Sequence, residues 1–305
     1  MAAIAVLGAG SFYGAAFVGL ARRQGHAVLC LARPAHDVNT HLDAIMAAVE
    51  ALRPDVFVNL AALNMVAESW QHAADYYRTN VIGITALAEA LRQWGGLQRF
   101  VQVSTPEVYG TTETPLKEDA PFRPSTPYAV SRAAADLHLQ SMHAAYGFPV
   151  VFTRTVNVYG PGQQPYRIVP KTVLSILQDR KLPLDGGGRS SRSFIHVDDA
   201  AGATLRVALE GRAGETYHVA TARQTAIRDL VEMICALMGR SFESVVEDVP
   251  ERLGKDNAYQ LDDSKIRAAL GWRDRIGLEP GLAQTVADIR ARPNEFVRLN
   301  YVHRP

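Results

Sequence analysis

Short apolar runs along the chain alternate with segments in which apolar residues recur at helical spacing. The runs 4–7, 27–32 and 56–58 are apolar at consecutive positions, which is typical of strands buried on both faces of a parallel sheet. Residues 37–53 instead carry apolar side chains three and four positions apart, as on one face of a helix. Strands that alternate with helices predict an α/β protein with a Rossmann-type, doubly wound parallel sheet.

The first of these strands ends in a glycine-rich turn, GAGSFYG (8–14), before a helix expected over Ala15–Gln24. A strand, a glycine turn, a helix and a second strand in this order predict a dinucleotide-binding unit, in which the pyrophosphate rests on the N-terminus of the helix. Ser11 occupies the middle of the turn, and its small side chain still permits a close approach of the backbone to phosphate. The residues expected to contact the cofactor here are Gly8, Gly10, Ser11, Phe12, Tyr13 and Gly14.

The end of the second strand bears on the choice of cofactor. An acidic residue at this place binds the ribose 2′-hydroxyl of NAD, whereas an arginine can accept the 2′-phosphate of NADP. Arg33 therefore favours NADP, with NAD as the alternative; in the other interpretation Arg33 is a solvated side chain. After the strand in PDVFVNLAA (54–62), Leu60 and the small residues Ala61 and Ala62 are expected to let the cofactor ribose lie against the backbone.

The stretch VQVSTPEVYG (101–110) and the later TPYAVSR (126–132) carry the candidate chemistry. A buried strand leads into Thr105 and Glu107, and a helix begins with Tyr128 and Arg132 four residues apart on one face. A permanent cation beside a phenol stabilises the phenolate, so Arg132 is expected to lower the pKa of Tyr128. Such a tyrosine can take a proton from a sugar hydroxyl while a nicotinamide takes the hydride.

These motifs resemble the extended short-chain dehydrogenase/reductase family, particularly its nucleotide-sugar 4,6-dehydratases, and the resemblance covers nearly the whole chain up to YQLDDSKIRAALGW (259–272). In that family the tyrosine deprotonates the sugar 4-hydroxyl while hydride passes from C4 to the nicotinamide. A glutamate then removes the C5 proton, the 6-hydroxyl leaves and hydride returns to C6. The resemblance gives the first role to Tyr128, assisted by Thr105 and Arg132, and the second to Glu107.

Three residues depart from the family pattern. Ser11 replaces the middle glycine of GxxGxxG, Arg132 replaces the lysine of YxxxK, and Pro106 replaces the aspartate before the glutamate. Since proline has no proton to give, Thr105, Tyr109, another group or water would protonate the leaving hydroxyl, or no hydroxyl leaves. An arginine can stabilise the phenolate and bind the nicotinamide ribose as lysine does, but it is effectively never deprotonated. We therefore expect redox chemistry at C4 to survive.

The resemblance also implies contacts with a nucleotide-diphosphate sugar in the second half of the chain. Asn157 in NVYGP is expected to contact the sugar or its phosphates, and Pro165–Val169 to lie near the base. Arg192 in RSFIHVDD and Arg252 are expected to bind the diphosphate, whose charges call for bidentate cations. The LARPA stretch (31–35) resembles NADP-dependent GDP-mannose dehydratases more than NAD-dependent dTDP-glucose enzymes, which again favours NADP.

The resemblance implies two interleaved domains: a dinucleotide-binding Rossmann domain over 1–160, and over 161–305 a smaller α/β domain that mainly binds the nucleotide sugar. The region before PDVFVNLAA is shorter than in typical dehydratases, so the strand that packs near the adenine is expected to be absent or abbreviated. Ser264–Leu270 is expected to be the final helix. A homodimer is implied through a four-helix bundle of the Ala73–Trp94 helix and the Tyr128 helix.

Composition and charge mainly exclude certain partners and sites. A net charge of +1 without blocks of like charge points to neither nucleic acid nor a membrane surface as a partner. Cys30 and Cys235 lie in apolar runs without metal-binding spacing, as in a reduced cytoplasmic protein, and the apolar N-terminus breaks at glycine too early for a signal sequence. His196, Asp198 and Asp199 could suggest a metal pair, but we prefer a helix start capped by the aspartates, with no metal.

Three hypotheses about function remain open. The first is a nucleotide-sugar 4,6-dehydratase, a lyase, and Glu107 favours it because 4-epimerases of the family usually carry a small residue there. The second is an epimerase or decarboxylase of the same family. The third is a dinucleotide-binding regulatory or assembly protein that has lost catalysis through the changes at Ser11, Pro106 and Arg132. The retention of Tyr128 argues against this third hypothesis.

Overall fold

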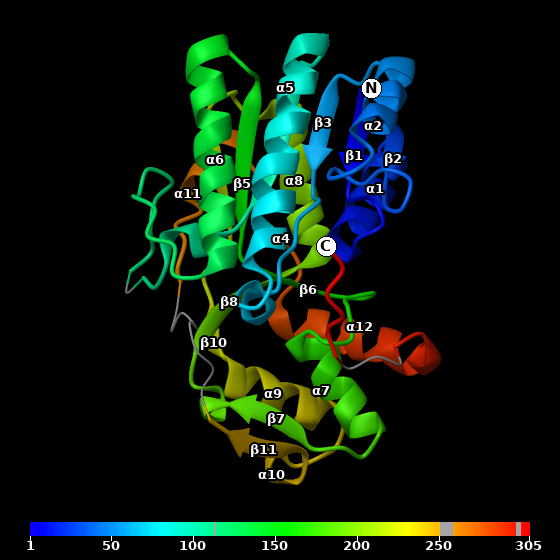
Figure 1. Cartoon of the computed structure of the whole chain (residues 1–305). Coiled ribbons are helices and arrows are strands. Elements are labelled where there is room, and N and C mark those ends of the chain that lie inside the picture. The colour runs from blue at the N-terminus through cyan, green and yellow to red at the C-terminus, as the bar shows by residue number, and fades with distance from the viewer. Residues whose placement is uncertain (113, 251–258, 297–299) are drawn as a thin grey trace.

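A parallel sheet of six strands forms the centre of the computed structural model, which describes residues 1–112, 114–250, 259–296 and 300–305 (Figure 1). The strand order is β2-β1-β3-β4-β5-β9. The strands are β1 (Ala3–Leu7), β2 (Ala27–Leu31), β3 (Val56–Asn59), β4 (Arg99–Ser104), β5 (Val150–Thr155) and β9 (Thr216–Val219). The order reverses beside β1, since β2 lies on one side of it and β3 on the other, and such a reversal opens a crevice at the carboxyl ends of the strands.

Helices cover both faces of this sheet because its strands are apolar on both sides. In β1, Ile4 and Val6 point into one apolar cluster, while Ala5 and Leu7 point into another. The first cluster lies under α1 (Phe12–Arg23), α8 (Val197–Glu210) and α11 (Ser264–Leu270). The second lies under α2 (Leu42–Leu52), α5 (Ile84–Trp94) and α6 (Pro127–Tyr146). The predicted α/β class and doubly wound sheet are confirmed.

Residues between β2 and β3 form a single helix, α2, and β2 is an edge strand of the sheet within the described residues. The expectation that the strand near the adenine is absent is therefore confirmed for these residues. The missing strand leaves the carboxyl end of β2 without a neighbouring strand on that side. Arg33, two residues beyond β2, is accordingly exposed at the edge of the sheet.

The helix expected over Ala73–Trp94 is interrupted. It consists of α4 (Ala73–Tyr77), a π-helical turn (Arg78–Gly83) and α5. In the π-helical turn, the buried amide of Asn80 accepts a hydrogen bond from the backbone N–H of Leu63 at 2.9 Å and donates to the carbonyl oxygen of Leu63 at 3.0 Å. Asn80 therefore has a structural role, because it fixes the loop after β3.

A smaller layer lies beyond the carboxyl edge of the main sheet (Figure 1). Its helices α7 (Ile168–Leu177), α9 (Ile227–Leu237) and α12 (Leu278–Ala291) pack around a separate apolar cluster. Its strands form two small sheets, β10-β8-β6 and β11-β7. Their bounds are β6 (Asn157–Tyr159), β7 (Leu182–Asp185), β8 (Ser191–His196), β10 (Gln224–Ala226) and β11 (Val246–Val249). The short α3 (Val66–Ser69) and α10 (Phe242–Val245) complete the α-helices of the described ranges.

The two layers share the chain unevenly. The helices α8 and α11 and the strand β9 come late in the sequence yet belong to the main sheet layer. Because α12 follows α11, the expectation that Ser264–Leu270 is the final helix is wrong. Within the described ranges, no helix is long and apolar enough to cross a membrane.

Candidate active site

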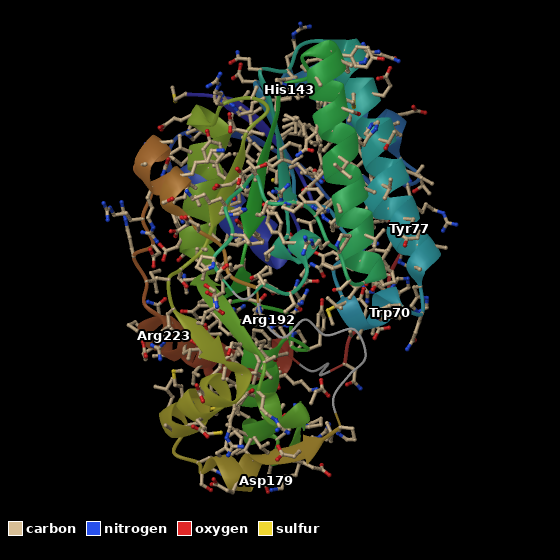
Figure 2. All side chains as sticks on the ribbon, turned by 90° about the vertical axis from the view of Figure 1, so that its left-hand side faces the viewer. Trp70, Tyr77, His143, Asp179, Arg192 and Arg223 are labelled. Atoms are coloured by element: carbon tan, nitrogen blue, oxygen red, sulfur yellow. The ribbon has the colours of Figure 1, made fainter. Side chains whose placement is uncertain are left out.

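The carboxyl ends of the central strands open into a cavity of about 1230 Å³ between the two layers. Side chains from both layers line it, among them Tyr128 and Glu107 from the main layer and Asn157 and Arg192 from the smaller one. Figure 2 shows Arg192 between the two layers. The cavity thus brings the predicted cofactor, catalytic and substrate residues together with two exceptions. Gly14 does not line the cavity, and Arg252 lies outside the described residues.

The glycine turn forms one wall of this cavity. Gly8 has a φ of 85°, and a Cβ there would lie 2.9 Å from the backbone nitrogen of Ala61. A Cβ on Gly14 would collide with the backbone oxygen of Gly8. Gly10 differs, because a Cβ there would meet no protein atom closer than 3.6 Å. The fold itself requires Gly8 and Gly14, whereas Gly10 borders open space in the cavity.

Ser11 acts as a helix cap. Its hydroxyl accepts a hydrogen bond from the N–H of Gly14 at 3.0 Å and donates to the oxygen of Gly8 at 2.7 Å. This capping explains why α1 begins at Phe12 and not at the expected Ala15. Tyr13 also lines the cavity, but its buried hydroxyl bonds the carbonyl oxygen of Ala200 in α8, and burial raises its pKa to about 12.

Arg33 stands at the rim of the cavity, where an adenosine ribose would lie. Its Nη1 donates hydrogen bonds of 2.9 Å to the backbone oxygens of Arg304 and Pro305. The same nitrogen lies 4.0 Å from a carboxylate oxygen of Asp37. The group predicted to bind a 2′-phosphate is therefore bound to the chain's own backbone.

Tyr128, Thr105 and Glu107 meet at the floor of the cavity. Tyr128 lies in the first turn of α6, which Thr126 caps by accepting a hydrogen bond from the N–H of Ala129 at 3.1 Å. Thr105 directly follows β4 and is hydrogen-bonded to the side chain of Tyr128. The carboxylate of Glu107 is close enough to Tyr128 to influence its pKa. The three side chains thus converge on one space.

The pKa of Tyr128 is raised, contrary to the expectation that Arg132 lowers it. Burial of the phenol is the largest cause, since the phenolate loses its hydration. Arg132 lowers the pKa as expected, but Glu107 raises it further. The sequence indicated the cation correctly and could not indicate how deeply the phenol is buried.

Arg132 is buried, with 2% of its surface exposed. One guanidinium nitrogen, Nη2, donates to the carbonyl oxygen of Val103, whereas Nε and Nη1 have no partner among the described residues. Buried donors without a partner are costly, so this guanidinium fits a site completed by a ligand with acceptor oxygens. The hydroxyls of a cofactor ribose have this chemistry.

Tyr109 is not available as a replacement for the missing aspartate. Its hydroxyl bonds Nε2 of His218 at 2.8 Å and accepts a hydrogen bond from the buried Arg154, and burial raises its pKa to about 12. Tyr109 lies in an apolar cluster and not among the residues that line the cavity. Of the two neighbours considered from the sequence, only Thr105 faces the cavity.

On the substrate side, Asn157 and Arg192 share a partner. The amide oxygen of Asn157 accepts a hydrogen bond from the hydroxyl of Tyr259 at 2.5 Å. The guanidinium carbon of Arg192 lies 4.8 Å from the centre of the Tyr259 ring. The predicted segment Pro165–Val169 also lines the cavity, and Arg167 within it donates to the side chain of Asn64 at 2.8 Å.

The motif at His196 is structural, although not in the way expected. Nδ1 of His196 accepts a hydrogen bond from the N–H of Asp198 at 3.3 Å, so the histidine caps α8. Asp199 instead accepts hydrogen bonds from the backbone N–H groups of Arg275 and Ile276. The expectation that the aspartates cap their own helix is therefore wrong, because Asp199 fixes the loop after α11.

Residues 300–305 were missed by the sequence reasoning. Asn300, Tyr301, Val302 and Arg304 line the cavity, although they follow the last helix by several residues. A short segment without apolar periodicity or a motif gives no signal of where it folds back. Its position depends on tertiary contacts alone.

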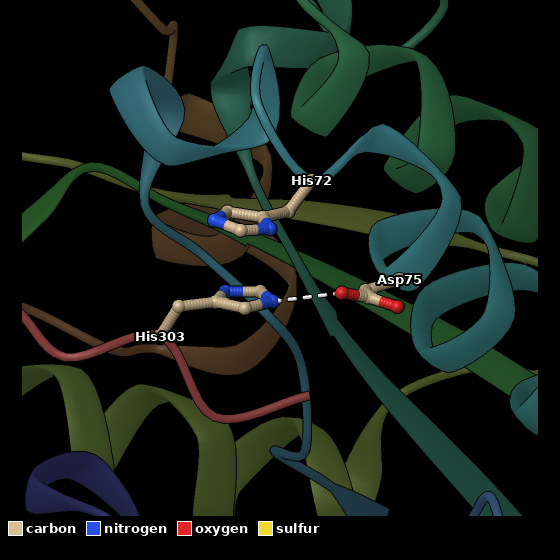
Figure 3. A group of neighbouring side chains, drawn as sticks. All are labelled: His72, Asp75 and His303. Atoms are coloured by element: carbon tan, nitrogen blue, oxygen red, sulfur yellow. Dashed lines mark hydrogen bonds and ion pairs between the residues drawn. The ribbon is translucent and has the colours of Figure 1, made fainter.

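His72, Asp75 and His303 form a cluster beside these residues (Figure 3). Their potential ligand atoms lie within 4.8 Å of one another. The two imidazole rings, however, stack with centres 3.9 Å apart and planes 7° apart. A metal ion lies in the plane of each imidazole that binds it, so one ion cannot serve both rings in this arrangement. The cluster is a stacked pair with a hydrogen bond between His303 and Asp75.

Comparisons with known proteins agree with this geometry. The model of the NAD dependent epimerase/dehydratase family matches residues 4–220. A dTDP-glucose 4,6-dehydratase of Streptomyces niveus is 38% identical over 233 residues, which cover 76% of this chain and 69% of that protein. A trifunctional enzyme of Arabidopsis thaliana that includes a UDP-glucose 4,6-dehydratase is 35% identical over 236 residues, and the match spans 35% of its length.

Two solved structures share the fold over nearly the whole chain. DesIV, a dTDP-glucose 4,6-dehydratase of Streptomyces venezuelae with NAD bound, has a TM-score of 0.92 at 30% identity and covers 98% of this chain and 100% of its own. The UDP-glucose 4-epimerase of Thermus thermophilus in complex with NAD has a TM-score of 0.89 at 26% identity, with 95% and 99% covered. This chain belongs to the NAD dependent epimerase/dehydratase family and is an NAD(P)-dependent, dehydratase-like enzyme of the extended short-chain dehydrogenases/reductases.

Proposed function

We propose that the protein is a nucleotide-sugar 4,6-dehydratase. The observation that supports this most directly is that Tyr128, Thr105 and Glu107 line one cavity together with the glycine turn. A phenol beside a dinucleotide can support oxidation of an alcohol, and a carboxylate on the same cavity adds the removal of a carbon-bound proton. Relatives of the same architecture include dTDP-glucose 4,6-dehydratases.

In the proposed reaction Tyr128 takes the proton of the sugar 4-hydroxyl, with Thr105 hydrogen-bonded to the phenol. A bound NAD(P) supplies a hydride acceptor at this step and a hydride donor at the last one. The positive charge of its oxidised nicotinamide would stabilise the phenolate in the same sense as Arg132 does, which opposes the effect of burial on the pKa. The 4-ketone acidifies the C5–H bond, and Glu107 takes that proton.

The departing 6-hydroxyl needs a proton, and Pro106 cannot supply one. We propose that Glu107, protonated once it has taken the C5 proton, gives a proton to the leaving oxygen. Tyr109 is turned away from the cavity, and the side chain of Ser104 is already a donor to Asp136 at 2.8 Å. The elimination then releases water, hydride returns to C6, and C5 takes a proton from solvent, which balances the reaction.

Product analysis tests this function. The protein is incubated with NAD(P) and a panel of nucleotide hexoses, and the products are examined by mass spectrometry. A dehydratase gives a product lighter by one water, and Glu107→Gln abolishes that product. An isomer of unchanged mass would indicate an epimerase and loss of carbon dioxide a decarboxylase. Cofactor and sugar binding without any turnover would indicate a protein that has lost catalysis.

We also propose a nucleotide-diphosphate sugar as the substrate and NAD or NADP as the cofactor. A nucleotide-diphosphate sugar fits the cavity because Arg192 and Asn157 face it from the smaller layer, and relatives act on dTDP- and UDP-sugars. Arg33 predicts NADP by its charge, yet DesIV holds NAD. The choice between NAD and NADP depends on whether the guanidinium of Arg33 is available, since it is hydrogen-bonded to residues 304 and 305.

We further propose a homodimer that uses the outer faces of α4–α5 and α6. Large apolar side chains are exposed there, among them Ile82 at 64% and Leu137 at 55%. Tyr77 and Trp70 extend this surface, and Figure 2 shows them along the outer side of the helices. Exposed apolar side chains that cluster in this way are typical of an interface with another chain.

A further inference from the structure

The 300–305 segment forms a wall of the cofactor end of the cavity. In Figure 1 it is the red trace that runs from the smaller layer to the carboxyl edge of the main sheet, where the C label stands. Tyr301, Val302 and Arg304 line the cavity, which retains about 1230 Å³ with the segment in place. Drug-sized ligand sites typically enclose roughly 300–1,000 Å³, so the segment is a wall that leaves room for a ligand.

Side-chain contacts attach the segment to the main layer. Nε2 of His303 lies 2.9 Å from a carboxylate oxygen of Asp75, and its ring stacks on His72 (Figure 3). Tyr301 is hydrogen-bonded to the hydroxyl of Tyr76 and packs edge-on against Tyr166, with ring centres 5.2 Å apart. Two side chains of the segment, Tyr301 and His303, are thus held by residues outside it. These residues are His72, Asp75, Tyr76 and Tyr166.

The far end of the segment binds Arg33. Two backbone oxygens, those of Arg304 and Pro305, accept hydrogen bonds from the same guanidinium nitrogen. Arg33 follows the strand whose end carries the residue that reads the adenosine ribose in dinucleotide-binding folds. The acceptors of the segment and the oxygens of a 2′-phosphate would therefore bind the same donor.

We propose that the 300–305 segment makes this site select NAD over NADP. While the segment is attached, its oxygens occupy Nη1 of Arg33 and place negative partial charge where a 2′-phosphate would lie. The segment belongs to the same chain and binds Arg33 intramolecularly, so the effective concentration of its oxygens at Arg33 is high, on the order of millimolar. NAD lacks the 2′-phosphate and needs no contact with Arg33. The inference rests on the NAD(P) dependence of the proposed function and not on the dehydration step.

Equilibrium binding of NAD⁺ and NADP⁺ tests this, measured by calorimetry on the full chain and on a chain that ends at residue 299. We expect the shortened chain to bind NADP⁺ about tenfold more tightly, since Arg33 gains a charge-assisted partner. NAD⁺ affinity should change by less than about threefold, well under the 1.4 kcal/mol of a tenfold effect. Arg33→Ala in the shortened chain should return NADP⁺ affinity to that of the full chain.

A second variant keeps the full chain but weakens the attachment of the segment. His303→Ala removes the hydrogen bond to Asp75 and should shift the NADP⁺/NAD⁺ ratio in the same direction as shortening does. The matched control is His41→Ala, an exposed histidine outside the cavity, which should leave the ratio unchanged. Equal gains for both cofactors, or no change in either, would overturn the proposal. The experiment measures cofactor binding and not turnover. A protein without dehydratase activity could therefore still show the cofactor selectivity, and the two results are distinguishable.

Discussion

At the scale of single residues, the site depends on how burial and two neighbouring charges, those of Glu107 and Arg132, change the pKa of Tyr128. Burial and the carboxylate of Glu107 raise its pKa, and Arg132 lowers it. In the proposed reaction the phenolate takes the proton of the sugar hydroxyl, and the population of the phenolate rises with pH. The rate of C4 oxidation should therefore increase with pH until the phenol of the complex is titrated.

Glu107→Gln should move this pH dependence. The substitution removes a negative charge near the phenol, so the pKa of Tyr128 falls and the rising limb of the rate profile shifts to lower pH. Single-turnover formation of reduced cofactor, followed by its absorbance, measures the limb without requiring water to leave. An unchanged profile would show that Glu107 does not act on Tyr128. Tyr128→Phe, as a control, should lower the rate about a hundredfold or more.

Arg132→Lys tests whether a cation is sufficient at this position. A lysine carries the same charge toward Tyr128, so turnover should stay within about tenfold of that of the unaltered protein. Loss of a positioned acid or base group would instead cost about a hundredfold or more. Arg132→Met removes the charge and should raise the pKa of Tyr128, which shifts the rate profile to higher pH. Complete loss of activity in the lysine variant would contradict a role based on charge.

At the scale of elements, the glycine turn separates the requirements of the fold from those of the ligand. Gly10→Ala places a methyl in space that the protein leaves open, whereas Gly14→Ala forces a collision with the backbone of Gly8. Gly10→Ala should therefore change the melting temperature by less than about 2 °C, yet weaken cofactor binding about tenfold or more.

Gly14→Ala is the matched comparison in the same turn. It should destabilise the protein by about 1–3 kcal/mol, as overpacked buried positions do. Thermal melting and calorimetric titration of both variants distinguish the two effects. Destabilisation by Gly10→Ala, with cofactor affinity retained by the folded fraction, would contradict the assignment of its space to a ligand.

The sequence predicted those elements that depend on patterns of neighbouring residues. The apolar runs specified the strands, and the turn at Gly8 specified the cofactor end of the cavity. The spacing of Tyr128 and Arg132 placed both side chains on one helical face. The burial that raises the pKa of Tyr128, the π-helical turn at Asn80 and the path of the 300–305 segment depend on contacts distant in sequence, so local patterns could not predict them.

At the scale of the whole molecule, the cavity exists because two layers meet at the carboxyl edge of one sheet. The main layer supplies Tyr128, Thr105 and Glu107, and the smaller layer faces them with Asn157 and Arg192. The layers are interleaved in sequence, since β9 and α8 return to the main sheet after β6 and α7 have left it. This connectivity holds the two walls of the cavity together.

The exposed apolar surface on α6 predicts the assembly state. Leu137→Glu places a charge in the proposed dimer interface and should convert a dimer to a monomer, measured by light scattering after size exclusion. The melting temperature of a monomeric variant should depend less on protein concentration than that of the unaltered protein. A monomer before any substitution would contradict the proposed homodimer.

The most direct test of the whole account is the reaction of a nucleotide hexose with NAD(P) in heavy water, followed by mass spectrometry and proton resonance spectra of the product. If Tyr128 and Glu107 act on the same sugar, the product has lost one water and carries deuterium at C5, and Glu107→Gln forms reduced cofactor without losing water. A product of unchanged mass, or water loss that survives Glu107→Gln, would contradict the account.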